Sequence, residues 1–128
     1  MIKTGRGKII HPKISYKLTG LFFKIHNELG RFYKERQYAD ALEILLRREK
    51  IKFVREKKIV KNFYDSEISC GIPDFIIENK LAVDLKAKKV ITKEDYFQMM
   101  RYLKAKNFRL GLIVNFRNSY LKPKRILN

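Results

Sequence analysis

Hydrophobic and polar residues alternate along two short runs near the middle of the chain, as expected for two half-buried strands. Phe75 and Ile77 share one face of the first run, while Leu81, Val83 and Leu85 share one face of the second. Both faces can reach a common core only if Ile77 lies opposite Leu81, because a slip of one residue would turn one of them outward. The pattern therefore predicts an antiparallel hairpin that also pairs Phe75 with Val83.

Apolar residues recur at three- and four-residue spacing in three other segments, which indicates amphipathic helices. The third of them begins with a capping box formed by Thr92 and Asp95. We expect helices over 15–29, 33–48 and 92–106, strands over 52–60, 109–116 and 125–127, and a turn-rich connector with room for a short strand over 62–71. This order predicts an α/β fold, a mixed central β-sheet flanked by α-helices on both sides. A right-handed crossover should join the hairpin to the strand at 109–116.

The charge of the chain is strongly positive. Its 128 residues include 30 Lys and Arg against 13 Asp and Glu, a formal net charge of +17. Solubility of a small domain needs a net charge of only roughly 2–8, so the excess implies a polyanionic partner, most simply nucleic acid. We expect DNA in preference to RNA, and no membrane partner. The length suits one domain, which we place over 15–128, after a flexible basic arm over 1–14.

The single cysteine, Cys70, excludes an intramolecular disulfide and is typical of a reducing compartment. The first residues lack the apolar core of a signal peptide, and no run approaches the 18 apolar residues of a membrane span. We therefore expect a cytoplasmic protein, and a homodimer stays open.

Two acidic residues and a lysine stand on the predicted hairpin. Continuing its ladder places Asp74 opposite Asp84, and directly opposed like charges destabilise a sheet. A bound divalent cation would compensate, and Lys86 points to the same face as Asp84. Metal-assisted hydrolysis of a phosphodiester needs this set of groups. The alternative is a solvated outer face on which Lys86 is only an ion-pair partner.

Further candidates lie on the predicted helices. Gln98 and Tyr102 form an i, i+4 pair that either faces Asp84 across the sheet or only flanks the core. Glu35 offers a third carboxylate, or else pairs with a neighbouring cation on the helix surface. The candidate ligands are oxygen atoms, which favour Mg²⁺ or Mn²⁺. Zinc is improbable because the chain has two histidines and one cysteine. A basic margin that could bind the nucleic-acid backbone comprises Lys88, Lys89, Lys93, Arg101, Lys104 and Lys106.

These residues resemble a known signature. Pro73-Asp74 with Asp84-Leu85-Lys86 resembles the PD-(D/E)xK signature of a nuclease superfamily, and the Gln98–Tyr102 segment resembles its QxxxY motif. Over about residues 16–127 the chain is similar to the small GxxExxY proteins of that superfamily, with Glu35 and Tyr38 in the motif. It departs from the pattern at Phe32, where the first glycine belongs, and at Arg31, where proline is usual.

The resemblance implies a restriction-endonuclease-like core and a Mg²⁺- or Mn²⁺-dependent phosphodiesterase acting on nucleic acid. Asp74, Asp84 and the Leu85 carbonyl would hold the metal, and Glu35 would hold a second metal or its water. Lys86 would position the attacking water, Gln98 would orient Lys86 or the scissile phosphate, and Tyr102 would line the site. The alternatives are a non-catalytic nucleic-acid-binding protein that retains this fold and, less favoured, a structural subunit of a larger complex.

Overall fold

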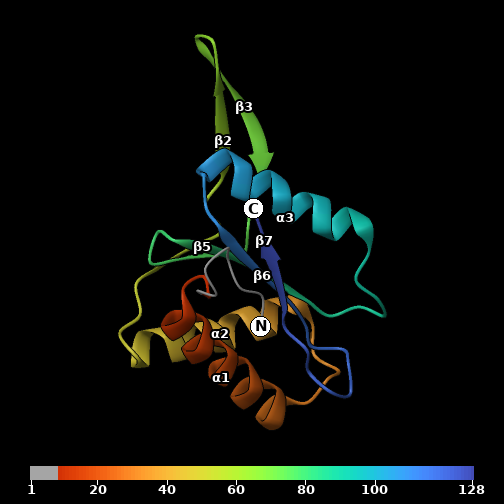
Figure 1. The fold of residues 1–128 in the computed structure, drawn as a ribbon. Coiled ribbons are helices and arrows are strands. Elements are labelled where there is room, and N and C mark those ends of the chain that lie inside the picture. Colours follow the sequence, from red (N-terminus) through yellow and green to blue (C-terminus); the bar gives the residue numbers. More distant parts are fainter. Residues whose placement is uncertain (1–8) are drawn as a thin grey trace.

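The computed structural model describes residues 9–128, which form a mixed sheet between helices and a projecting β-ribbon (Figure 1). In chain order the elements are α1 (Pro12–Leu29), α2 (Glu35–Arg48), β1 (Phe53–Arg55), β2 (Ile59–Phe63), β3 (Ser66–Gly71), β4 (Phe75–Ile77), β5 (Leu81–Lys86), α3 (Lys93–Lys106), β6 (Leu110–Asn115) and β7 (Lys124–Leu127).

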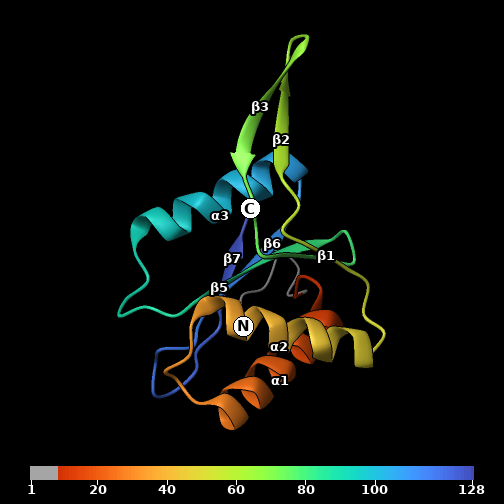
Figure 2. The ribbon, with the colours of Figure 1, turned by 180° about the vertical axis from the view of Figure 1, so that it is seen from behind.

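The main sheet has the strand order β1-β4-β5-β6-β7. Strands β5 and β6 are parallel and joined through α3, while the other neighbours pair antiparallel. Helices α1 and α2 lie on one face of the sheet and α3 on the other (Figures 1 and 2). The predicted α/β architecture, with a mixed sheet and helices on both sides, is confirmed.

The hairpin β4–β5 has the register that the alternation predicts. Ile77 pairs with Leu81, and Phe75 pairs with Val83. These residues belong to the core shared with α1 and α2, whereas Ile76 and Ala82 belong to the core under α3. Asp84 follows Ala82 by two positions and therefore points to the α3 face.

The boundaries differ from the prediction at two places. Helix α1 begins at Pro12, because proline suits the first helical position, and Ile10 before it is buried. The predicted flexible arm is thus wrong for its last residues, while 1–8 lie outside the described residues.

The expected strand over 52–60 is interrupted at Glu56, which has a φ of 55° that ends β1. The segment predicted as a connector forms most of the β2–β3 ribbon, which projects from the body of the molecule (Figure 1). Its side chains are mostly exposed on both faces. An alternating apolar pattern, the usual signal of a strand, is therefore missing there.

Within residues 9–128, no helix is both long enough and apolar enough to cross a membrane.

Candidate active site

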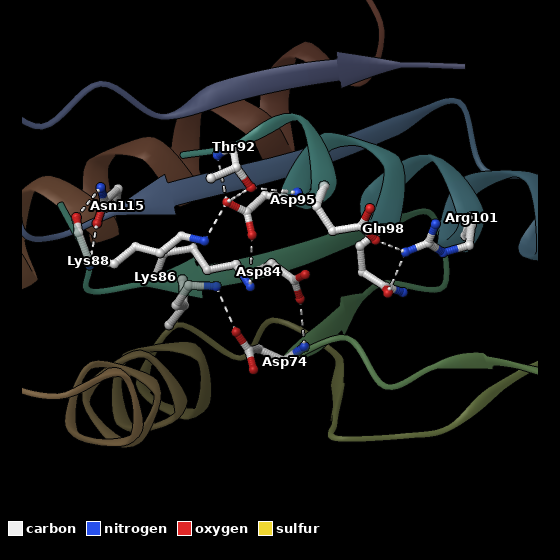
Figure 3. A network of polar contacts seen from close by, with 11 residues as sticks. Asp74, Asp84, Lys86, Lys88, Thr92, Asp95, Gln98, Arg101 and Asn115 are labelled. Atoms are coloured by element: carbon white, nitrogen blue, oxygen red, sulfur yellow. Dashed lines mark hydrogen bonds and ion pairs between the residues drawn. The ribbon is translucent and has the colours of Figure 1, made fainter. Parts of the chain in front are cut away.

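The two predicted carboxylates meet at the edge where β4 begins (Figure 3). The Asp74 N–H donates to Asp84 Oδ1 at 3.0 Å, and the Leu85 N–H donates to Asp74 Oδ2 at 2.7 Å. A backbone N–H near each of the two acidic residues thus orients the carboxylate of the other. Asp84 is only 5% exposed, so two acidic groups share a largely buried site.

Burial makes both carboxyl groups harder to ionise. Burial and then the charge of Asp84 raise the pKa of Asp74 to about 6. Burial also raises the pKa of Asp84, against the opposing effect of the hydrogen bond from the Asp74 N–H. Two ionised carboxylates this close together in a largely buried place are unfavourable at neutral pH, and a bound cation would offset that cost.

Lys86 supplies a positive charge that acts on both carboxylates of this pair. It follows Asp84 by two positions on β5, and its ammonium lowers the pKa of both Asp74 and Asp84. Its Nζ lies 3.8 Å from Asp95 Oδ1 on α3. The hypothesis that Lys86 only pairs with the two acids on a solvated surface fits poorly with the burial of Asp84.

Asp95 is a residue of this site that the sequence pattern identified only as a helix cap. Its Oδ2 accepts hydrogen bonds from the backbone and side chain of Thr92 and lies 2.5 Å from Lys88 Nζ. Burial opposes its ionisation, but the hydrogen bond from Lys88 and those from Thr92 hold the pKa of Asp95 below its usual range. Only a short loop joins β5 to α3. The shortness of this loop is a signal in the sequence that the first turn of α3, with Asp95, lies close to Lys86.

Gln98 and Tyr102 contribute differently to the site. Tyr102 is buried, and its burial, followed by the charges of Asp84 and Asp74, raises the pKa of its hydroxyl. The Gln98 amide donates to the Cys70 carbonyl at 2.9 Å, and its Oε1 accepts from Arg101 at 2.9 Å. The charges of both carboxylates thus act on the Tyr102 hydroxyl, whereas the Gln98 side chain joins α3 to the end of β3.

A family model described as the PD-(D/E)XK nuclease superfamily matches residues 12–126. The chain belongs to this superfamily. No curated protein and no solved structure matches the chain. Members of the PD-(D/E)XK superfamily are nucleases that generally use divalent metal ions, and the position of the acidic pair on the hairpin fits the signature after which the superfamily is named.

The donor set of this PD-(D/E)XK domain fits a divalent cation. Asp74 Oδ1 and Asp84 Oδ2 accept no hydrogen bond and form no ion pair within residues 9–128. Each carboxylate thus keeps one oxygen for a ligand while its other oxygen fixes its orientation. Oxygen donors of this kind suit Mg²⁺ and Mn²⁺.

Glu35 is not gathered into the acidic pair. It is the first residue of α2 and lines, with Asp74 and Arg55, a groove of about 410 Å³. Its charge contributes to the raised pKa of Asp74 and Asp84. In the described part of the chain, no three His, Cys, Asp or Glu side chains lie close enough together to hold a metal ion. Of the carboxylates predicted to hold metal, the structure brings Asp74 and Asp84 together, while Glu35 lies along the groove that Asp74 also lines.

Several residues of the predicted basic margin already have partners inside the protein. Lys88 pairs with Asp95, Arg101 with Glu94 and Gln98, and Lys104 with Asn128. Lys106 lies over the ring of Phe108. Within residues 9–128, Lys89 and Lys93 are exposed and form no ion pair, so they are the members of the margin best able to contact a phosphate.

The raised pKa values predict how stability changes with pH when metal is absent. Asp74 has a pKa of about 6 when folded against an ordinary 3.8, so the folded state binds a proton that the unfolded state has lost. The free energy of unfolding should therefore fall as pH rises from about 4 to about 6. Asp84→Asn removes one of the two charges, so the variant should gain on wild type over this range, by on the order of 1–3 kcal/mol at pH 7.

Urea unfolding of wild type and Asp84→Asn in chelator, from pH 4 to pH 8, measures this difference directly. Comparing two proteins that differ by one carboxylate cancels the titration of the acidic residues that lie away from the pair. If the free energy of unfolding changed with pH in the same way for both proteins over the whole range, the coupling between the two carboxyl groups would be contradicted. Adding Mn²⁺ at pH 7 should raise the stability of wild type more than that of the variant.

Gly71, the last residue of β3, should not tolerate a side chain. Its φ is 114°, and a Cβ there would lie 2.7 Å from Gln98 Nε2 and 3.0 Å from Tyr102 Cε1. Gly71→Ala should lower the free energy of unfolding by about 1–3 kcal/mol, through backbone strain and displacement of these two side chains. The matched control is Gly20→Ala in α1, where a Cβ meets nothing within 4 Å; there we expect a gain of about 0.5–1 kcal/mol. Thermal unfolding of both variants checks this, and equal effects would refute the packing of α3 against Gly71.

Proposed function

We propose that this protein is a Mg²⁺- or Mn²⁺-dependent nuclease that hydrolyses phosphodiester bonds in nucleic acid. The observation that carries the proposal is the pair formed by Asp74 and the buried Asp84, whose side chains accept reciprocal backbone hydrogen bonds, with Lys86 two residues after Asp84 on β5. A protein that only bound a polyanion would gain nothing from two closely spaced carboxylates facing its ligand.

Asp74 and Asp84 would hold the metal through the oxygens that no protein donor occupies. The Leu85 carbonyl is a third ligand in this proposal, because the Leu85 N–H points at Asp74 and both backbone groups of a strand residue face the same side. A divalent cation bound there supplies positive charge at the scissile phosphate and makes water more acidic. Glu35 would contribute a third carboxylate from the groove that it lines together with Asp74, and would hold a second metal or its water.

Lys86 would donate hydrogen bonds to the attacking water or to a phosphate oxygen. Asp95 holds the Lys86 ammonium from the α3 side at 3.8 Å and so limits where that group can point. Tyr102 would form the apolar wall next to Asp84. Gln98 would act as a positioning residue, since its contacts are with the Cys70 carbonyl and Arg101.

We also infer that the chain is of the GxxExxY type within its superfamily. The support is the packing of Tyr38, whose hydroxyl donates to the Gly30 carbonyl at 2.6 Å and whose ring stacks on Phe116 at 4.3 Å between centroids. These contacts fix the loop that leads into α2 and therefore the position of Glu35. The tyrosine would thus serve to place the glutamate, although Phe32 replaces the usual glycine.

The test is incubation of the purified protein with single- and double-stranded DNA and RNA of matched sequence, with Mg²⁺, with Mn²⁺ or with chelator. We expect cleavage of at least one substrate that depends on metal and stops in chelator, with DNA preferred over RNA. Tight, salt-sensitive binding without cleavage under any of these conditions would favour the non-catalytic nucleic-acid-binding alternative.

A further inference from the structure

A second groove, separate from the acidic pair, lies at the end of the sheet where the parallel strands β5 and β6 finish. It has a volume of about 610 Å³ and is lined by the loops that follow α1, β5 and β6. Figures 1 and 2 show these three loops gathered at the same end of the molecule. Loops at the carboxyl ends of parallel strands are a common place for ligands to bind.

The groove combines positive charge with two exposed aromatic rings. Phe32 is 79% exposed and Tyr120 is 83% exposed. The cations along it are Arg31, Lys89, Arg117 and Lys122. Among the described residues that line the groove, none is acidic. A single exposed aromatic side chain needs no explanation, but two of them among four cations form the arrangement that binds unpaired nucleic acid, with phosphates on the cations and bases stacked on the rings.

The floor of the groove is held by hydrogen bonds between the loops. Arg31 Nε donates to the Arg117 carbonyl at 2.7 Å, and Arg117 Nη2 donates to the Ala87 carbonyl at 3.3 Å. The buried Asn115 accepts from the Lys88 N–H at 3.1 Å and donates to the Lys88 carbonyl at 2.7 Å. The three loops are thereby tied to one another, so the side chains that project from them are arranged before any ligand binds.

Two cations remain available to a ligand. Arg31 and Arg117 already use part of their guanidinium groups in the floor. Lys89 and Lys122 are exposed, and within residues 9–128 they form no ion pair and no side-chain hydrogen bond. They stand with Phe32 and Tyr120 along the same groove, so a strand lying in it would meet charges and rings together.

The chain places this groove next to the acidic pair. Phe32 precedes Glu35 by three residues, and Lys89 follows Lys86 by three residues. Three residues span at most about 11 Å, which is about three steps of a stacked nucleic-acid strand. A strand whose phosphate lies at Lys86 can therefore continue into the groove.

We propose that this groove binds an unpaired segment of the substrate next to the bond that is cleaved, with bases stacked on Phe32 and Tyr120 and phosphates on Lys89 and Lys122. This rests on the proposed function and names its substrate class, namely single-stranded nucleic acid or a duplex with an unpaired end. An intact duplex fits less well, because its bases are stacked on one another and offer no free face to the rings.

The test measures binding without cleavage. Wild type and variants are titrated in chelator against a fluorescent single-stranded 12-mer, its duplex, and an abasic strand of the same length, followed by anisotropy. The variants are Phe32→Ala/Tyr120→Ala, Lys89→Ala/Lys122→Ala, Tyr120→Phe and, as a matched control, Tyr16→Ala. Tyr16 is 84% exposed on α1, near the opposite end of that helix from Phe32. DNA and RNA versions of the single strand distinguish the two sources of substrate.

We expect the double aromatic variant to lose at least about tenfold in affinity for the single strand and to bind the duplex and the abasic strand like wild type. Tyr120→Phe and Tyr16→Ala should keep wild-type affinity, since stacking needs only the ring and Tyr16 lies elsewhere. The double lysine variant should reduce the slope of log K against log salt by about 1.4, at about 0.7 per phosphate contact on a single strand. All four substituted side chains of the groove are exposed, so circular dichroism should show an unchanged fold.

Failure of this inference and failure of the nuclease proposal would look different. If the double aromatic variant loses no more affinity than Tyr16→Ala, or loses as much on the abasic strand, the groove proposal is overturned, whatever wild type cleaves. If the single strand binds through the two rings but no substrate is cleaved with any metal, the groove proposal stands and the nuclease proposal falls.

Discussion

Asp84→Asn should slow metal-dependent cleavage by at least about a hundredfold, which corresponds to a loss of at least about 2.7 kcal/mol of transition-state stabilisation. The substitution removes the charge of a nearly fully buried carboxylate at almost constant shape. The Asn side-chain oxygen can still accept the hydrogen bond from the Asp74 N–H, which is 3.0 Å long in wild type. The fold should therefore persist while the affinity for metal falls.

Single-turnover cleavage at several Mn²⁺ concentrations distinguishes loss of metal binding from loss of structure. If the variant binds metal more weakly, a higher Mn²⁺ concentration should recover part of its rate. The control is Asp65→Asn in the turn of the β2–β3 ribbon, which removes the same charge away from the site and should cleave like wild type. Equal loss in both variants would mean that net charge, and not the acidic pair, governs the rate.

Lys86→Ala should also slow cleavage by on the order of a hundredfold or more, but without loss of metal binding. The ammonium lowers the pKa of both acidic residues and lies near Asp95, so its removal deletes the charge that the proposal assigns to the attacking water or a phosphate oxygen. The metal ligands remain in place. The measurement pairs the cleavage rate with Mn²⁺-dependent thermal stabilisation, which the variant should retain.

Lys88→Ala separates a direct role of Lys86 from a role through Asp95. Lys88 is the closer cationic partner of Asp95, with 2.5 Å between Nζ and Oδ2, so its removal weakens the anchoring of Asp95 but keeps the Lys86 ammonium on β5. We expect a loss of less than about tenfold for this variant. If Lys88→Ala and Lys86→Ala are equally slow, the important feature is the anchoring of Asp95, and Lys86 does not itself position the water.

The hairpin that carries the acidic pair could be predicted from the sequence because both of its strands are buried on one face. The alternation of Phe75, Ile77, Leu81 and Val83 allowed only one register, and that register is confirmed. The proximity of Asp74 to Asp84 followed from it without any knowledge of the rest of the fold. Local periodicity is informative wherever a strand has one apolar face.

The β2–β3 ribbon could not be predicted in the same way. Both of its faces are largely exposed, so no core selects its residues, and the pattern resembled that of a turn-rich connector. Contacts between residues that are distant in the chain could not be predicted from the sequence either. Asp95 had a complete explanation as the cap of α3, and Lys88 was assigned to the basic margin, because nothing local in the sequence indicates that these two residues meet across the loop after β5.

The most direct measurement is the cleavage of a single-stranded oligonucleotide by wild type and Asp84→Asn, purified side by side and assayed with Mn²⁺ and with chelator. The proposed function predicts cleavage by wild type with metal, none in chelator, and a rate at least about a hundredfold lower for the variant. Equal cleavage by the two proteins, or cleavage by wild type that persists in chelator, would contradict the assignment of the Asp74–Asp84 pair as the metal-dependent active site.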